Sequence, residues 1–257
     1  MSDRTETFRD RLRAGEMLIG TWVKTPCPDV CEVLCATELD VLCLDAEHAP
    51  FDRAALDACI RVLRAGDMPC LVRVPDANPT GLQQALDSGA TGVVVPHVTT
   101  RQDAEAIARA CHFGSGGRGY AGSTRAAGFG SISIPEHLRL SRARTTVVAQ
   151  IEDAEALAEL DDIAACDDVD ALFIGRIDLT VSLGESRTDA PRVLGAVQKI
   201  CDAARSRQRS VGMFFGDLGE LAGWRAAGAS LFLLESDQAF LRQGAAALLA
   251  RAHAQSD

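Results

Sequence analysis

Acidic and imidazole side chains in this sequence follow short apolar runs. The stretch "DAEHAP" places Asp45, Glu47 and His48 directly after the run "VLCL". Further along the chain, Glu152 follows "VVAQI", and Asp178 comes shortly after "LFIG". Hard divalent cations prefer carboxylate oxygens, and histidine can move a proton near neutral pH. These residue types therefore indicate metal-assisted acid–base chemistry, provided that the fold brings them to one place.

Each of these residues also has an ordinary structural explanation. A carboxylate at a strand end can cap a helix or pair with an arginine, and a loop histidine can bond to a backbone carbonyl. The joint position of Glu152 and Asp178 after neighbouring apolar runs nevertheless favours a shared divalent cation. Arg73 lies inside the run "CLVRV". A buried guanidinium needs an anion beside it, either in a structural ion pair or on a substrate.

Eight short apolar runs predict β-strands at residues 17–22, 41–45, 70–74, 92–97, 146–152, 171–175, 210–215 and 231–236. The runs are continuous rather than alternating, which is typical of parallel strands covered on both faces. The segments between them carry apolar residues at helical spacing. We therefore predict a single (β/α)₈ barrel domain over residues 1–257, with a doubly wound sheet as the alternative.

Barrel enzymes hold their chemistry at the C-terminal ends of the strands. In this sequence the polar residues gather at those ends. Asp45, Glu47 and His48 would follow the second strand, His97 the fourth and Asp178 the sixth. The predicted fold therefore brings the chemically competent side chains to one rim.

Composition narrows the class of protein. The net charge of −10 and the pI near 5.0 argue against a nucleic-acid partner. No apolar run approaches the length of a membrane span, so we expect a cytoplasmic protein without a membrane partner.

Nine cysteines, an odd number, lie among apolar neighbours, which predicts reduced thiols. Cys27, Cys31 and Cys35 share a helix face, and a core-facing stripe explains them better than a metal clip does.

Several motifs together resemble the HpcH/HpaI aldolase/citrate lyase family. They are "LDAEHAP", "LVRVP", "QQALDSGATGVVVPHV", "GGRGY", "AQIED" and "LFIGRIDL", in the order and spacing of that family. The sequence is similar in particular to its metal-dependent 4-hydroxy-2-oxo-heptanedioate and 2-keto-3-deoxy sugar acid aldolases. The resemblance covers almost the whole chain.

The resemblance implies a fold, an assembly and a reaction. The fold would be a (β/α)₈ barrel whose C-terminal helix is exchanged between subunits of a hexamer, a trimer of dimers. The reaction would be reversible cleavage of a 4-hydroxy-2-oxo acid to pyruvate and an aldehyde, through a pyruvate enolate stabilised by Mg²⁺, Mn²⁺ or Co²⁺. The partners would therefore be small molecules.

The resemblance also implies residue roles. Glu152 and Asp178 would be metal ligands, His48 the base, and Asp87 the acid that raises its basicity. Substrate contacts would come from Arg73, which stabilises the transition state, and from Gln150, Gly175, Ile177 and Asp178. Asp45 and Glu47 would position these residues without binding the metal or the substrate themselves.

Three residues depart from the family pattern. Arg176 and Ile177 stand where the family usually has a proline and a small or polar residue, and His97 stands where many relatives have an apolar residue. One interpretation is that Arg176 binds a distal carboxylate of the aldehyde. The other is that its side chain points outward, into a subunit contact or solvent. The sequence does not assign a role to His97.

Other functions are weaker alternatives. A CoA-thioester lyase of the citrate lyase or malyl-CoA lyase kind would need a basic groove, and a catalytically idle keto-acid-binding oligomer would lack part of the site. A Schiff-base aldolase needs a lysine inside the barrel, and neither Lys24 nor Lys199 is well placed by sequence. The glycine-rich "GSGGRG" follows a helical pattern rather than a strand, which argues against a dinucleotide site.

Overall fold

The computed structural model describes residues 4–255, which form a closed barrel of eight parallel strands. The strands are β1 (Leu18–Val23), β2 (Val41–Asp45), β3 (Cys70–Arg73), β4 (Gly92–Val95), β5 (Thr146–Ile151), β6 (Ala171–Ile174), β7 (Ser210–Phe215) and β8 (Ala229–Ser236). Each strand pairs with the next along the chain, and β1 pairs with β8. This closure confirms the predicted (β/α)₈ barrel and excludes the doubly wound sheet.

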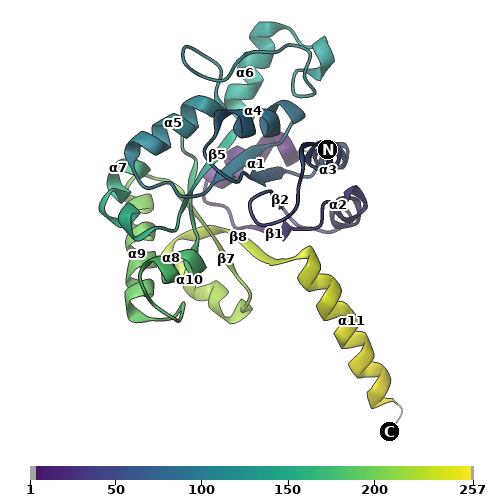
Figure 1. Cartoon of the computed structure of the whole chain (residues 1–257), viewed down its shortest axis with the longest axis vertical. Coiled ribbons are helices and arrows are strands. Elements are labelled where there is room, and N and C mark those ends of the chain that lie inside the picture. Colours follow the sequence, from purple (N-terminus) through teal and green to yellow (C-terminus); the bar gives the residue numbers. More distant parts are fainter. Residues whose placement is uncertain (1–3, 256–257) are drawn as a thin grey trace.

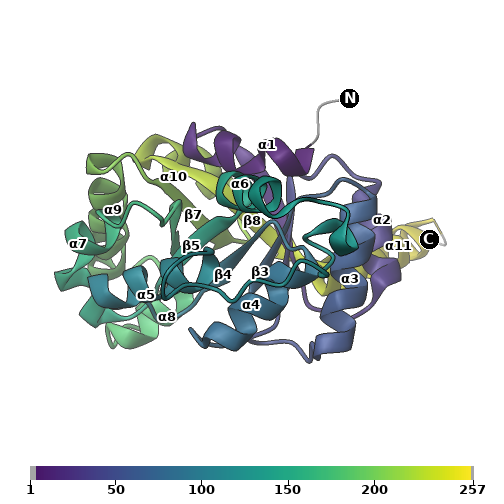
Figure 2. The ribbon, with the colours of Figure 1, turned by 90° about the horizontal axis from the view of Figure 1, so that it is seen from above.

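Helices surround the barrel and connect its strands (Figures 1 and 2). They are α1 (Arg4–Arg13), α2 (Pro28–Cys35), α3 (Arg53–Ala65), α4 (Pro79–Ser88), α5 (Arg101–Cys111), α6 (Ile134–Arg144), α7 (Leu160–Ala164), α8 (Arg176–Ser182), α9 (Pro191–Ser206), α10 (Leu221–Ala227) and α11 (Asp237–Ala254). Three short 3₁₀ turns are η1 (Gly128–Gly130), η2 (Ala154–Ala158) and η3 (Leu218–Glu220). None of the helices within residues 4–255 has both the length and the apolar character that crossing a membrane requires.

The apolar strands bury side chains on both faces, which explains their continuous patterning. One face packs against the helices, where Ile60 and Leu63 of α3 join a large core. The other face fills the barrel interior, where Trp22 and Phe173 meet edge to face at 5.8 Å between ring centroids. The interior is therefore a packed core rather than a channel.

The first helix closes the N-terminal end of the barrel. Phe8 and Leu12 of α1 are fully buried in the interior cluster. Arg9 donates from Nε to Oδ1 of Asp170 at 2.9 Å, just before β6 begins. The N-terminal end of the barrel is therefore covered by α1, which leaves the opposite ends of the strands for a site.

The last helix leaves the barrel instead of packing on it (Figure 1). It begins at an N-cap, Ser236, whose hydroxyl accepts the backbone N–H of Ala239 at 3.3 Å. Large apolar side chains along α11 are exposed: Phe240, Leu241, Leu248 and Leu249. A helix with such residues in water lacks a packing partner within its own chain.

Candidate active site

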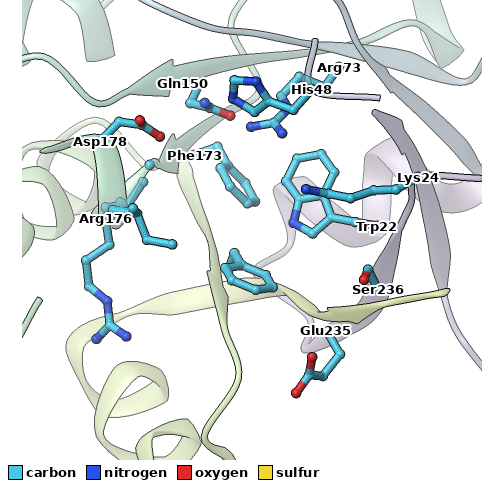
Figure 3. Close-up of a pocket in the computed structure, with 14 residues that line it drawn as sticks. Trp22, Lys24, His48, Arg73, Gln150, Phe173, Arg176, Asp178, Glu235 and Ser236 are labelled. Carbon is cyan, nitrogen blue, oxygen red and sulfur yellow. The ribbon is translucent and has the colours of Figure 1, made fainter. Parts of the chain in front are cut away.

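A cavity of about 310 Å³ opens at the C-terminal ends of the strands. Figure 3 shows the residues that line it, which come from β1, β3, β5, β6, β7 and β8, from loops that follow strands and from the first turn of α8. Those labelled are Trp22, Lys24, His48, Arg73, Gln150, Phe173, Arg176, Asp178, Glu235 and Ser236. The volume is within the usual range for small-molecule sites, about 300–1,000 Å³.

Arg73 is held by a buried carboxylate on the neighbouring strand. Residues 45 and 73 are register partners in the β2–β3 pair. Arg73 donates from Nε to Asp45 Oδ1 at 3.0 Å and from Nη2 to Oδ2 at 2.8 Å, and its guanidinium lies 4.2 Å from the centre of the Trp22 ring. Burial alone would raise the pKa of Asp45, but the hydrogen bonds and charge of Arg73, the backbone N–H of His48 and the charge of Lys24 together lower it. The structure thus supplies the anionic partner that the sequence required, with guanidinium donors left over.

Glu47 lies close to this pair but is incompletely satisfied. Its Oε2 is 3.3 Å from Arg73 Nε and 3.7 Å from His48 Nε2. The same oxygen is buried and has no hydrogen-bond partner among the described residues. Burial raises the pKa of Glu47 in spite of the nearby cations.

Glu152 and Gln150 project from the end of β5 into the same region. Glu152 is 2% exposed, and its Oε1 accepts the backbone N–H of His97 at 2.9 Å. Its Oε2 accepts from Gln150 Nε2 at 2.5 Å. The other amide atom, Gln150 Oε1, is buried without a partner in the part of the chain that the structure describes. Residues two apart along a strand share a face, which is why Glu152 lies beside Gln150, the one of the two that lines the pocket.

His97 belongs to this cluster, although its role could not be assigned from the sequence. Its backbone has a φ of 56°, and its Nδ1 lies 2.9 Å from Asp153 Oδ2. The hydrogen bond to Asp153 raises the pKa of His97, with Glu152 and Glu47 adding to the effect. Potential ligand atoms of Glu47, His97 and Glu152 all lie within 4.8 Å of one another. The position after Pro96 at a strand end was the signal that could have identified it.

Asp178 and His48 line the pocket as expected. Asp178 lies in the first turn of α8, and Figure 3 shows its carboxylate directed toward Gln150. It does not join the compact group formed by the ligand atoms of Glu47, His97 and Glu152. The backbone N–H of His48 donates to Asp45 Oδ1 at 3.1 Å, which fixes the loop after β2.

Asp87 is not brought to His48 within one chain. It lies on α4, where its carboxylate accepts from Gln83 Nε2 at 3.3 Å and lies 4.0 Å from Arg118 Nε. It lines a separate surface hollow together with Arg125 rather than the pocket. The predicted partnership of Asp87 with His48 would therefore require a second copy of the chain.

The structure does not support a role for Arg176 in binding a carboxylate of the substrate. Its guanidinium pairs with Glu220, with Nη2 3.2 Å from Oε1, and lies 5.3 Å from the centre of the Trp224 ring. Trp224 Nε1 donates to the same Glu220 at 2.7 Å. In Figure 3 the guanidinium points away from Asp178. Neither interpretation from the sequence anticipated this ion pair within the chain.

Gly175 and Ile177 shape the wall beside Glu152. Ile177 is 57% exposed at the pocket rim. A Cβ atom at residue 175 would lie 2.6 Å from Glu152 Oε2 and 2.7 Å from its Cβ. Only glycine therefore lets β6 end this close to the carboxylate.

We expect Gly175→Ala to destabilise the protein by about 1–3 kcal/mol, because the added methyl group overpacks a fixed side chain. Thermal unfolding measures the effect. Gly195→Ala is the matched control, since a Cβ there has nothing within 4 Å and alanine favours the helix α9. Equal stability of the two variants would contradict the close approach at Gly175.

Comparisons with known proteins agree with this architecture. The model of the HpcH/HpaI aldolase/citrate lyase family matches residues 18–243. A hydroxypyruvate/pyruvate aldolase of Roseovarius nubinhibens is 30% identical over 251 residues, which is 96% of each chain. A 4-hydroxy-2-oxovalerate aldolase of Rhodococcus jostii is 35% identical over 215 residues, 83% of each chain. The crystal structure of a HpcH/HpaI aldolase/citrate lyase family protein from Burkholderia cenocepacia matches with a TM-score of 0.91 at 32% identity, covering 96% of this chain and 99% of that one.

A barrel with an acidic, arginine-containing rim and this set of relatives defines a carbon–carbon lyase of the aldolase type. The chain belongs to the HpcH/HpaI aldolase/citrate lyase family. The motifs quoted from the sequence predicted this membership.

Proposed function

We propose that the protein is a metal-dependent pyruvate aldolase that reversibly cleaves a 4-hydroxy-2-oxo acid to pyruvate and an aldehyde. The observation that carries the proposal is the close grouping of ligand atoms of Glu47, His97 and Glu152, with Glu47 3.3 Å from Arg73. Arg73 and Asp178 in turn line the strand-end pocket. The aldolase relatives support the same reaction class.

The residues present fit a divalent cation. Glu47 Oε2 and Gln150 Oε1 are buried oxygens without hydrogen-bond partners among the described residues, and such atoms are costly unless something binds them. Glu152 and Asp178 would hold Mg²⁺, Mn²⁺ or Co²⁺, with Glu47 and His97 close enough to complete or support the set. When bound, the cation would act as a Lewis acid that stabilises negative charge on the pyruvate enolate.

The protein's own groups would orient pyruvate and move its protons. Arg73, fixed by Asp45, has donors left to hold a developing oxyanion. Gln150 Oε1, which lacks a partner among residues 4–255, is positioned to orient bound substrate. His48 is 54% exposed on its side chain and would exchange a proton between pyruvate carbon and solvent. Trp22 and Phe173, both buried, form an apolar floor that excludes water from below.

Chelation should abolish pyruvate release from 4-hydroxy-2-oxo acids, and Mg²⁺, Mn²⁺ or Co²⁺ should restore it. The physical reason is that the divalent cation would supply most of the stabilisation of the enolate charge. Pyruvate can be assayed directly across a panel of such acids, with borohydride trapping as the control. Full activity in chelator, or a covalent pyruvate adduct on Lys24, would refute the mechanism.

We also infer that the protein works as an oligomer. The form that we propose is a hexamer, built as a trimer of dimers in which the C-terminal helices are exchanged between subunits. The exposed apolar side chains of α11 support this inference because they need a partner surface. Asp87 supports it as well, because only a neighbouring subunit could bring this carboxylate to His48.

A further inference from the structure

A second cavity, of about 150 Å³, lies at the N-terminal end of the barrel, opposite the candidate active site. Its lining comes from the last turns of α3 and α4, from α6 and the loop before it, from the start of α1 and from the residues just before β4 and β5. Figure 2 shows α6 beside α1 in this region. The volume is below the usual range of small-molecule sites, about 300–1,000 Å³, so a ligand of this cavity would be small.

The lining of this cavity is cationic, although the chain carries a net charge of −10. Three arginines and one histidine border it: Arg64, Arg118, Arg144 and His137. No aspartate or glutamate borders it among the residues that the structure describes. Arg64 is exposed, which keeps the cavity within reach of solvent. Such surroundings stabilise an anion and disfavour a cation.

Arg118 is buried with donors that the described residues do not use. It is 6% exposed, and its Nε and Nη1 atoms have no hydrogen-bond partner among residues 4–255. Its Nη2 donates to Ser141 Oγ at 3.3 Å, and its guanidinium lies 4.0 Å from the centre of the Phe113 ring. Asp87 Oδ1 is 4.0 Å from Nε, which is too long for a hydrogen bond. Burial lowers the pKa of Arg118 in spite of Asp87, so the guanidinium lacks a full counter-charge.

Two uncharged donors border the same cavity. His137 Nδ1 and Thr5 Oγ1 are buried and lack hydrogen-bond partners in the part of the chain that the structure describes. Burial and the charge of Arg118 lower the pKa of His137, so its ring is neutral near neutral pH. In the tautomer that carries the proton on Nδ1, this atom is a donor. Unsatisfied donors from three residues around one cavity indicate a site for oxygen atoms of a ligand or of ordered water.

We propose that this cavity binds a small oxyanion, represented by inorganic phosphate, with Arg118, His137 and Thr5 as its donors. Water could accept these hydrogen bonds, but it would leave the buried charge of Arg118 uncompensated. A guanidinium can also donate to two oxygens of a phosphate at once. The site is separate from the strand-end pocket, and the proposal does not depend on the aldolase reaction.

Calorimetric titration of the whole protein with sodium phosphate, at an ionic strength held constant with sodium chloride, measures the binding. Ser141→Asp should weaken it by about ten- to a hundredfold, because the new carboxylate would lie beside Arg118 Nη2 and take the place of the ligand. Ser141→Asn is the matched control, since it has the same shape without the charge, and its affinity should stay close to that of the parent. Glycerol phosphate distinguishes the source of the anion: binding as tight as that of phosphate would assign the site to a phosphate ester, and weaker binding to the free ion.

Thermal unfolding gives a second measurement. Phosphate should raise the Tm of the parent and of Ser141→Asn, and it should raise that of Ser141→Asp far less. Arg118→Met should bind no phosphate in this cavity; if that variant does not fold, the Ser141 pair still decides, because both of its members keep every arginine. Phosphate bound at the strand-end pocket would not respond to residue 141. Equal phosphate affinity of Ser141→Asp and Ser141→Asn, or no binding by the parent, would therefore overturn the proposal and leave the cavity to water.

Discussion

Glu152→Gln is expected to abolish metal binding and to lower turnover by about a thousandfold or more, since the cation contributes several kcal/mol of transition-state stabilisation. The substitution preserves shape, and the new amide oxygen can still accept the backbone N–H of His97. A folded but inactive variant is therefore the expected result. Calorimetry with Mn²⁺ measures binding, and pyruvate release measures turnover.

Glu155→Gln is the matched control for this variant, because Glu155 is an exposed acid three residues further along the chain. The same titration distinguishes two ligand sets. If Glu152 and Asp178 hold the cation, Asp178→Asn should weaken Mn²⁺ binding strongly and His97→Ala only weakly. The reverse order would assign the cation to the Glu47–His97–Glu152 group. Undiminished Mn²⁺ binding by Glu152→Gln would contradict both.

His48→Ala should slow the exchange of pyruvate methyl protons with solvent by about a hundredfold or more, the usual scale for a lost general base. Metal affinity should remain near that of the parent, because His48 Nε2 lies 3.7 Å from Glu47 but outside the group of ligand atoms. Proton NMR in deuterated water follows the exchange. His253→Ala, near the end of α11, controls for the loss of an imidazole. Unchanged exchange would assign the base to another residue.

The strands could be predicted closely from sequence because both faces of a parallel barrel strand are buried. The predicted run 41–45 coincides with β2, and the run 210–215 coincides with β7. The side-chain environment of Arg73 was also predictable, since a guanidinium inside an apolar run has to meet an anion. The burial of a strand and the need of a buried charge for a partner can both be inferred from the local sequence.

Side-chain direction beyond the strand ends could not be predicted in the same way. Arg176 was a candidate substrate contact, but its partner Glu220 is 44 residues away and no local pattern links them. Asp87 shares a helix face with Gln83, so its position on α4 decides which pocket it can reach. Lys24 was set aside as poorly placed by sequence, and its position in the cavity follows from barrel closure through β1 and β8.

The N-terminal turn of α11 has a mechanical consequence for the pocket. Asp237 is the first residue of this outward-projecting helix and is buried. Its carboxylate accepts the backbone N–H groups of Lys24 at 2.7 Å and Thr25 at 3.1 Å. A change in the direction of α11 would therefore be passed through two hydrogen bonds to the segment that carries Lys24, which lines the cavity. If a neighbouring subunit holds α11, as we propose, dilution that separates the subunits should release α11 and shift Lys24 before the barrel unfolds, so the shape of the pocket would depend on protein concentration.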